Sequence, residues 1–228
     1  MTGRGFTVAL IGCDGAGKTT VARALERDTD LPVRYLYMGV SSDSSNRQLP
    51  TTRVAHLVKR RRGAAPDTAG PRLPAPEPAP AGAVRRARRS ARSTLRLLNR
   101  SAEEWYRQLL ALAYQRRGQI VVFDRHFTAD YHARDVAAER RTLSRRVHGL
   151  MLTRLYPQPD LVIFLDAPPA VLHARKGEGT IASLGRRREE YFALGATLPR
   201  FRVVSATRPL PEVVGEVASI VRGHGGRA

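Results

Sequence analysis

The sequence predicts a three-layer α/β domain, in which helices cover both faces of a five-stranded parallel sheet. Three observations lead to this prediction. Short apolar runs of strand length alternate with longer segments of helical periodicity along the 228 residues. The first run, Phe6 to Ile11, is continuously apolar, as expected for a strand that is buried on both faces. A glycine-rich loop, Gly12 to Gly17, then joins this strand to a helix.

The remaining strands and helices follow from apolar spacing and from Gly and Pro punctuation. Gly118 ends one long helix, and Pro157 and Pro159 precede another strand. The further strands are predicted at Val33–Met38, Gln119–Phe123, Leu161–Leu165 and Phe201–Val204. Helices are predicted at Lys18–Arg27, Ser93–Arg117, Thr142–Leu155, Pro168–Lys176, Arg186–Leu194 and Pro211–Val221, with a short basic helix at Arg53–Arg62 as a weaker prediction.

The whole chain, residues 1–228, is predicted to form one domain with one insertion. Residues 63–82 are dominated by Ala and Pro, and a basic run continues to Arg92. A segment of this composition cannot bury enough apolar surface to offset the entropy lost on ordering. We therefore expect residues 63–92 to form a flexible insertion.

Composition limits the classes of protein to consider. The formal net charge is +19, and residues 53–100 hold 13 Lys and Arg against two Asp and Glu. Such charge suggests nucleic-acid binding, but this stretch contains no Phe, Tyr or Trp on which bases could stack. Nucleic-acid association is therefore disfavoured but not excluded. The chain has one cysteine, which rules out an internal disulfide, and no apolar run long enough to span a bilayer. These features predict a cytoplasmic protein.

The loop after the first strand carries the clearest chemical signal. Residues 12–19 fit the pattern G-x-x-x-x-G-K followed by Ser or Thr. Glycines allow backbone N–H groups to surround a phosphate, and the helix that follows directs its positive end at the anion. Lys18 would neutralise phosphate oxygens, and the Thr19 hydroxyl would bind Mg²⁺. The residues predicted to bind ATP here are Gly12, Asp14, Gly15, Ala16, Gly17, Lys18, Thr19 and Thr20.

Three segments together resemble the thymidylate kinases. They are the loop at Gly12–Thr20, the strand end at Val121–His126 and the fourth strand at Pro159–Pro169. The resemblance implies the strand order 2-3-1-4-5, ATP and Mg²⁺ as cofactors, and phosphoryl transfer to a nucleoside monophosphate such as dTMP. It also implies a homodimer, although no residues in the sequence identify its interface.

The resemblance assigns roles to residues around the phosphate loop. Asp14 would face the acceptor, or it would stabilise the loop through hydrogen bonds. Asp124 would serve the metal or orient the acceptor, and the alternative is a helix cap. Arg125 would clamp the acceptor phosphate or the transferred phosphoryl group, and the alternative is a surface salt bridge.

Residues 174–190 resemble the family's lid. The phosphate loop holds no arginine, so a catalytic arginine would come from this lid, with Arg175, Arg186 and Arg187 as candidates. The alternative is a solvated charged helix. Thr207 lies in the turn after the fifth strand, which touches adenine in the resembling family.

The acceptor side departs from the family's motifs. No Arg-x-Pro follows the second strand, Tyr131 is out of register with the family's tyrosine, and Arg100 is the nearest candidate for an acceptor-binding arginine. Two alternatives to a nucleotide kinase therefore stay open: a kinase of a non-nucleotide hydroxyl compound such as a sugar, and a nucleotide-binding module with a basic insertion. A GTPase is disfavoured because the chain has no Asn-Lys-x-Asp motif, and its six histidines lack the spacing of metal ligands.

Overall fold

A computed structural model describes residues 5–39, 83–126, 143–198 and 200–226. Its five strands form one parallel sheet in the order β2-β3-β1-β4-β5, which confirms the order that the resemblance implied. The strands are β1 (Thr7–Ile11), β2 (Val33–Tyr37), β3 (Ile120–Asp124), β4 (Leu161–Asp166) and β5 (Phe201–Ser205). The α/β class is therefore as predicted.

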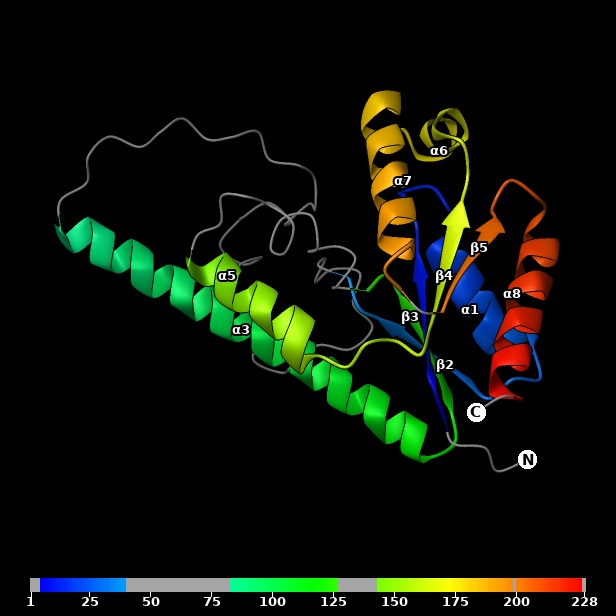
Figure 1. The fold of residues 1–228 in the computed structure, drawn as a ribbon, viewed down its shortest axis with the longest axis horizontal. Helices are drawn as coiled ribbons and strands as arrows, with labels where there is room; N and C mark the ends of the chain where they lie inside the picture. Colours follow the sequence, from blue (N-terminus) through cyan, green and yellow to red (C-terminus); the bar gives the residue numbers. More distant parts are fainter. Residues whose placement is uncertain (1–4, 40–82, 127–142, 199, 227–228) are drawn as a thin grey trace, which may run out of the picture.

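Helices cover both faces of this sheet (Figure 1). Helices α1 (Lys18–Asp28) and α8 (Leu210–Gly225) lie on one face. The other face is covered by α3 (Ala83–Arg116) and α7 (Ile181–Gly195), with α5 (Leu143–Leu150) packed along α3. A short α6 (Pro169–Lys176) connects β4 to α7. Within the described residues, no helix combines the length and apolar character needed to cross a lipid bilayer.

The central strands explain the apolar runs in the sequence. Every residue of β1 and β3 is buried, as expected where helices cover both faces of a parallel strand. The registers Leu10↔Asp124 and Ile11↔Phe164 bring the carboxyl ends of β1, β3 and β4 to the same edge. In open α/β sheets, ligands bind outside this edge.

Two helix starts differ from the sequence prediction by five residues or more. Helix α3 begins at Ala83, ten residues before the predicted Ser93, so the last ten residues of the predicted insertion, 83–92, are helical. Alanine and arginine have high helix propensity, which outweighs the compositional similarity of this stretch to the preceding segment. Helix α7 begins at Ile181 and not at Arg186, because Thr180 and Ser183 form a capping box.

A third difference concerns the helix predicted over Thr142–Leu155. Regular α5 ends at Leu150, and Met151–Leu155 form a π-helix, η2. The Tyr156 N–H donates to the Met151 carbonyl at 3.0 Å, which closes this wider turn. The insertion core at residues 63–82, the weak helix at 53–62 and Tyr131 all lie outside the described residues. The single-domain organisation of residues 1–228 stays a prediction.

A polar contact joins the beginnings of β1 and β4. The Thr7 N–H and hydroxyl both donate to Asp160 Oδ2 at 2.8 Å, and the Asp160 N–H donates back to Thr7 Oγ1 at 3.0 Å. Thr7 is buried, so its hydroxyl is satisfied only through this contact among the described residues. The contact fixes the start of the strand that leads into the phosphate loop.

We expect Thr7→Val to lower the free energy of unfolding by about 1 kcal/mol, because the Asp160 N–H loses its acceptor while side-chain shape is kept. Urea unfolding followed by circular dichroism measures this loss. Thr153→Val is the matched control, since the exposed Thr153 hydroxyl contacts only the carbonyls of Gly149 and Leu150 in its own turn, among the described residues. Equal losses in the two variants would contradict a special role for the β1–β4 contact.

Candidate active site

The loop between β1 and α1 has the backbone that its glycines require. Gly12, Gly15 and Gly17 have φ angles of 151°, 88° and 82°, which side chains rarely permit. A Cβ at Gly12 would lie 2.7 Å from the Leu165 carbonyl oxygen, and one at Gly15 would lie 2.7 Å from that of Leu172. The sequence pattern therefore reflects both backbone conformation and close packing.

The N-terminus of α1 opens onto this loop. Its N-cap is Gly17, and neither a side-chain cap nor an acidic residue occupies its first turn. An anion at this position would meet backbone N–H groups and the positive end of the helix dipole. Thr20 is exposed in the same turn, beside Thr19.

Lys18 lies over the loop. Its side chain is buried, and Nζ donates to the carbonyl oxygens of Gly12 at 2.9 Å and Cys13 at 2.7 Å. These contacts hold an ammonium group within the phosphate-binding loop. The positive charge that the motif predicts is thus positioned by the loop itself.

Cys13, which belongs to the phosphate loop, packs against α7. The thiol is buried, and Sγ lies 3.7 Å from the Leu184 carbonyl oxygen. Burial raises the pKa of Cys13, although the charges of Lys18 and Arg187 oppose this effect. The cysteine is therefore a packed thiol that connects the loop to α7.

Asp124 is the polar centre of the site. Its side chain is 0 % exposed at the end of β3. Oδ2 accepts hydrogen bonds from the Thr19 hydroxyl at 2.5 Å and from the Tyr35 hydroxyl at 3.1 Å. Oδ1 has no hydrogen-bond partner among the described residues. The structure thus brings together Thr19 and Asp124, the two residues predicted to serve the metal, and adds Tyr35.

These donors suit Mg²⁺ in a particular way. The described residues contain no cluster of three His, Cys, Asp or Glu side chains that could hold a metal alone. Mg²⁺ in kinases usually binds through one or two protein oxygens together with phosphates and water. A threonine hydroxyl beside a buried carboxylate with one open oxygen fits that coordination.

Asp14 and Arg125 form an ion pair at the mouth of the loop. Arg125 Nη2 donates to Asp14 Oδ1, and Lys176 Nζ lies 3.9 Å from the same oxygen. Burial alone would raise the pKa of Asp14, but the charges of Arg125, Lys18 and Lys176 together lower it. Arg125 has a φ of 64°, and its N–H donates to the Leu10 carbonyl at 3.1 Å. Such a backbone persists in a residue with a side chain only where the surroundings fix it.

The candidate lid arginines have different surroundings. Arg175 Nη1 donates to the Ala206 carbonyl at 2.8 Å, in the turn after β5. Arg186 is exposed on α7. Arg187 lies with its guanidinium 5.8 Å from the Tyr191 ring centroid, and its charge reaches Cys13 in the phosphate loop. The positive charge of Arg187 thus acts on the phosphate loop.

A fourth arginine, which the sequence analysis did not select, anchors α7. Arg188 Nε and Nη2 donate to the two Asp166 carboxylate oxygens at 2.6 and 2.8 Å. This bidentate pair joins α7 to the end of β4. The run of arginines at 186–188 predicted a positively charged segment, but the sequence alone does not show which guanidinium faces the sheet.

Helix α3 carries a further residue that sequence reasoning missed, near the predicted Arg100. Arg107 on α3 is buried, donates to the Gly39 carbonyl at 3.0 Å and lies 3.6 Å from Glu103. It stands seven residues, about two helical turns, after the predicted Arg100, whose side chain lies outside the description. Helical spacing from Arg100 could have identified it.

Thr207, the predicted adenine-side residue, lies in an exposed turn with its hydroxyl 2.9 Å from that of Ser205.

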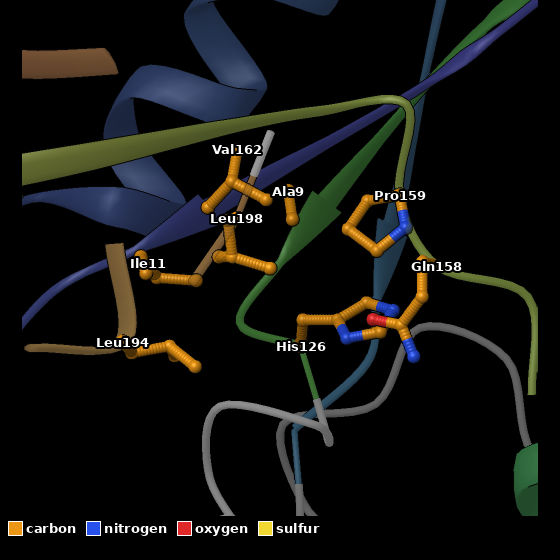
Figure 2. Close-up of a pocket in the computed structure, with 8 residues that line it drawn as sticks. All are labelled: Ala9, Ile11, His126, Gln158, Pro159, Val162, Leu194 and Leu198. Carbon is orange, nitrogen blue, oxygen red and sulfur yellow. The ribbon is translucent and has the colours of Figure 1, made fainter. Parts of the chain in front are cut away.

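His126 follows the Asp-Arg pair but has a different environment. Burial lowers its pKa to about 3, so the imidazole is neutral at physiological pH. Figure 2 shows its ring at the edge of a pocket whose other residues are largely apolar, including Ile11, Val162, Leu194 and Leu198. This pocket lies under the end of α7 and lacks the charges of a phosphate site.

Comparisons with known proteins agree with the predicted resemblance. No family model matches the chain. A thymidylate kinase of Xanthomonas campestris is 28% identical over 230 residues, covering 97% of this chain and 85% of that protein. A thymidylate kinase of Xylella fastidiosa is 26% identical over 223 residues, covering 94% and 89%. A probable thymidylate kinase of Sulfolobus acidocaldarius is 27% identical over 120 residues, covering 49% and 59%. The chain is therefore similar to thymidylate kinases over most of its length.

The pH dependence of the free energy of unfolding should change when Asp14, and with it the Asp14 ion pairs, is replaced. Because the folded pKa of Asp14 is lowered, its carboxylate stabilises the fold above the unfolded pKa, and this contribution is lost as pH falls through the folded pKa. We expect Asp14→Asn to lower the free energy of unfolding by about 1 kcal/mol at pH 7, and by less at acid pH. Urea unfolding across this pH range measures the difference. Asp30→Asn removes an exposed carboxylate as the control, and a pH-independent effect of Asp14→Asn would contradict the ion pairs.

Proposed function

We propose that this thymidylate kinase-like chain is an ATP- and Mg²⁺-dependent kinase that phosphorylates a nucleoside monophosphate, with dTMP as the first candidate acceptor. The observation that carries the proposal is the convergence of Lys18, Thr19 and Asp124 on one glycine loop. Similarity to thymidylate kinases over most of the chain supports the class of reaction. A kinase of this class would find ATP and its acceptor in the cytoplasm.

The donor side follows from the loop. Backbone N–H groups of the loop and of the α1 N-terminus would bind the β- and γ-phosphates, while Lys18 would exchange its carbonyl contacts for phosphate oxygens. Thr19 and Asp124 would hold hydrated Mg²⁺. When bound, Mg²⁺ supplies positive charge that neutralises the phosphate oxygens. Thr207 in the turn after β5 stays the candidate for the adenine side.

On the acceptor side, Arg125 would supply positive charge beside this loop. Arg125 would orient the acceptor phosphate, and Asp14 would fix the Arg125 guanidinium until the acceptor binds. Residues 174–190 would act as a lid over the phosphates, with Arg187 better placed than Arg175 or Arg186 to reach the loop. Catalysis would then consist of positioning and charge neutralisation.

A non-nucleotide hydroxyl compound is the second candidate acceptor. Helix α3 carries the buried Glu103 beside Arg107, and Arg107 contacts the Gly39 carbonyl. Arg100, three residues before Glu103 on the same helix, was expected to bind the acceptor phosphate. A buried carboxylate is suited to accept hydrogen bonds from a hydroxyl group and is unsuited to a second phosphate. A sugar would therefore also fit this wall.

An acceptor panel tests the proposal. ATP turnover would be measured with dTMP, dUMP, other nucleoside monophosphates, nucleosides and sugars, and products would be identified by mass. We expect transfer to a nucleoside monophosphate, and we expect Lys18→Ala to lower kcat by at least about 100-fold because a charge that stabilises the transferred phosphoryl group is lost. Circular dichroism checks that the variant is folded.

Two results would redirect the proposal. Transfer only to a sugar or another hydroxyl compound would favour the second candidate. Full activity in Lys18→Ala, or no transfer to any acceptor by a chain that binds ATP, would contradict the kinase assignment at this loop.

We also propose that two copies of the chain pair through α3. Apolar residues recur on this helix at alternating steps of three and four, which is the seam of a helix pair. Their side chains are exposed, and the exposed fraction of the large ones runs from 37% for Trp105 to 68% for Leu95. The flanking positions of the seam carry no charge, so identical seams can meet without like-charge repulsion. The seam consists of Leu95, Leu98, Ala102, Trp105, Leu109 and Leu112.

Leu109→Glu should convert a dimer into a monomer, because burying an unpaired carboxylate in the seam is unfavourable. Size-exclusion chromatography with light scattering at several concentrations measures the mass. Leu155→Glu is the control, since Leu155 is similarly exposed but lies on η2, outside the seam. A monomeric wild-type chain at tens of micromolar, or dimers in both variants, would contradict this interface.

A further inference from the structure

Tyr35 contributes a buried hydroxyl to the phosphate site from a strand that the motif does not include. Its side chain is almost wholly buried on β2, and Oη donates to Asp124 Oδ2 at 3.1 Å. We propose that Tyr35 is a positioning residue, which holds the Asp124 carboxylate so that Oδ1 stays available to hydrated Mg²⁺ at Thr19. This inference rests on the proposed function, and it assigns a role to a residue of this chain outside the phosphate loop.

The strand register explains how Tyr35 reaches the site. Tyr37 pairs with Asp124 in the β2–β3 ladder, so Tyr35 lies two residues earlier along its strand. A tyrosine side chain is long enough to lean along a strand by about two residues, roughly 7 Å. The hydroxyl therefore arrives beside the carboxylate although the two backbones are not paired in register.

Helix α1 holds the tyrosine ring in place. The Arg23 guanidinium lies 5.6 Å from the ring centroid, and the Tyr35 N–H donates to Glu26 Oε1 at 3.1 Å. Both residues lie on the helix that also presents Thr19. Helix α1 thus carries Thr19 and also holds Tyr35 of β2. The packing of α1 on β2 therefore fixes the separation of the two hydroxyls that donate to Asp124.

The two hydroxyls occupy one carboxylate oxygen and leave the other open. Thr19 and Tyr35 both donate to Asp124 Oδ2, which accounts for the usual two acceptor positions of that oxygen. Oδ1 is buried and has no hydrogen-bond partner among the described residues. Burying an open carboxylate oxygen is unfavourable unless a ligand or water engages it. The asymmetry points to Oδ1 as the ligand-facing atom.

Tyr35→Phe removes only the hydroxyl and keeps the ring between α1 and β3. The probe is AMP-PNP, an ATP analogue with an imido bridge, and its dissociation constant is measured by calorimetry in Mg²⁺ and in EDTA. We expect the improvement in affinity that Mg²⁺ gives the wild-type chain to fall by about tenfold in Tyr35→Phe, as for other groups that orient a metal-binding carboxylate. Affinity in EDTA should match the wild type, because the phosphate loop is unchanged.

Tyr156→Phe is the matched control. Tyr156 is also buried and also donates to a carboxylate, Glu104 Oε2, at 2.9 Å. This contact joins the residue that follows η2 to α3 and does not involve the phosphate loop. We expect the control to lose stability in urea unfolding while its Mg²⁺ effect on AMP-PNP affinity stays within twofold of wild type.

The outcomes separate this inference from the proposed function. A normal Mg²⁺ effect in Tyr35→Phe would show that Tyr35 is only structural, and the kinase proposal would stand. An equal loss of affinity in Mg²⁺ and in EDTA would also overturn the positioning role. A wild-type chain that binds no AMP-PNP, or binds it without any Mg²⁺ effect, would overturn the metal-dependent kinase proposal together with this inference.

Discussion

Burying a carboxylate without exposure to water requires that the surrounding structure supply its partners, and the arrangement around Asp124 shows how strongly this requirement shapes the site. Thr19 arrives from α1, Tyr35 from β2, and Asp124 itself ends β3. These three elements must pack together before the carboxylate is satisfied on even one oxygen. The phosphate loop precedes Thr19 directly, so its position relative to the sheet depends on the same contact.

The class and most elements of this fold were predictable because the determining signals are local, whereas the strand order came from the resemblance to thymidylate kinases. Central parallel strands are apolar runs, and glycine and proline mark their ends, as at Gly118 and Pro159. The predicted start of α3 was wrong because residues 83–92 share the Ala- and Arg-rich composition of the preceding segment, while their backbone preference is helical. The start of α7 depends on a side-chain cap at Thr180, which competes with several similar polar residues in the sequence.

The candidate site divides in the same way. The sequence identified residues held by the loop motif, Lys18 and Thr19, and the strand-end residue Asp124, because their spacing along the chain is fixed by backbone geometry. Tyr35 was missed because its contact with Asp124 joins two strands that are distant in the sequence. The Asp166–Arg188 pair was missed because it depends on which side chain of the arginine run points toward the sheet. The catalytic and acceptor roles of Arg125, Arg175, Arg186, Arg100 and Tyr131 stay predictions.

The length and direction of α3 change how the chain's overall charge should be interpreted. Its N-terminal part extends well beyond the edge of the sheet, away from β1 and α1 (Figure 1), and this part carries a dense series of arginines. Much of the basicity therefore belongs to an arm and not to the nucleotide cradle. Bulk properties such as isoelectric point or retention on a cation exchanger therefore include a large contribution from that arm. They give little information about the local potential experienced by a phosphate in the loop, which a few short-range groups determine.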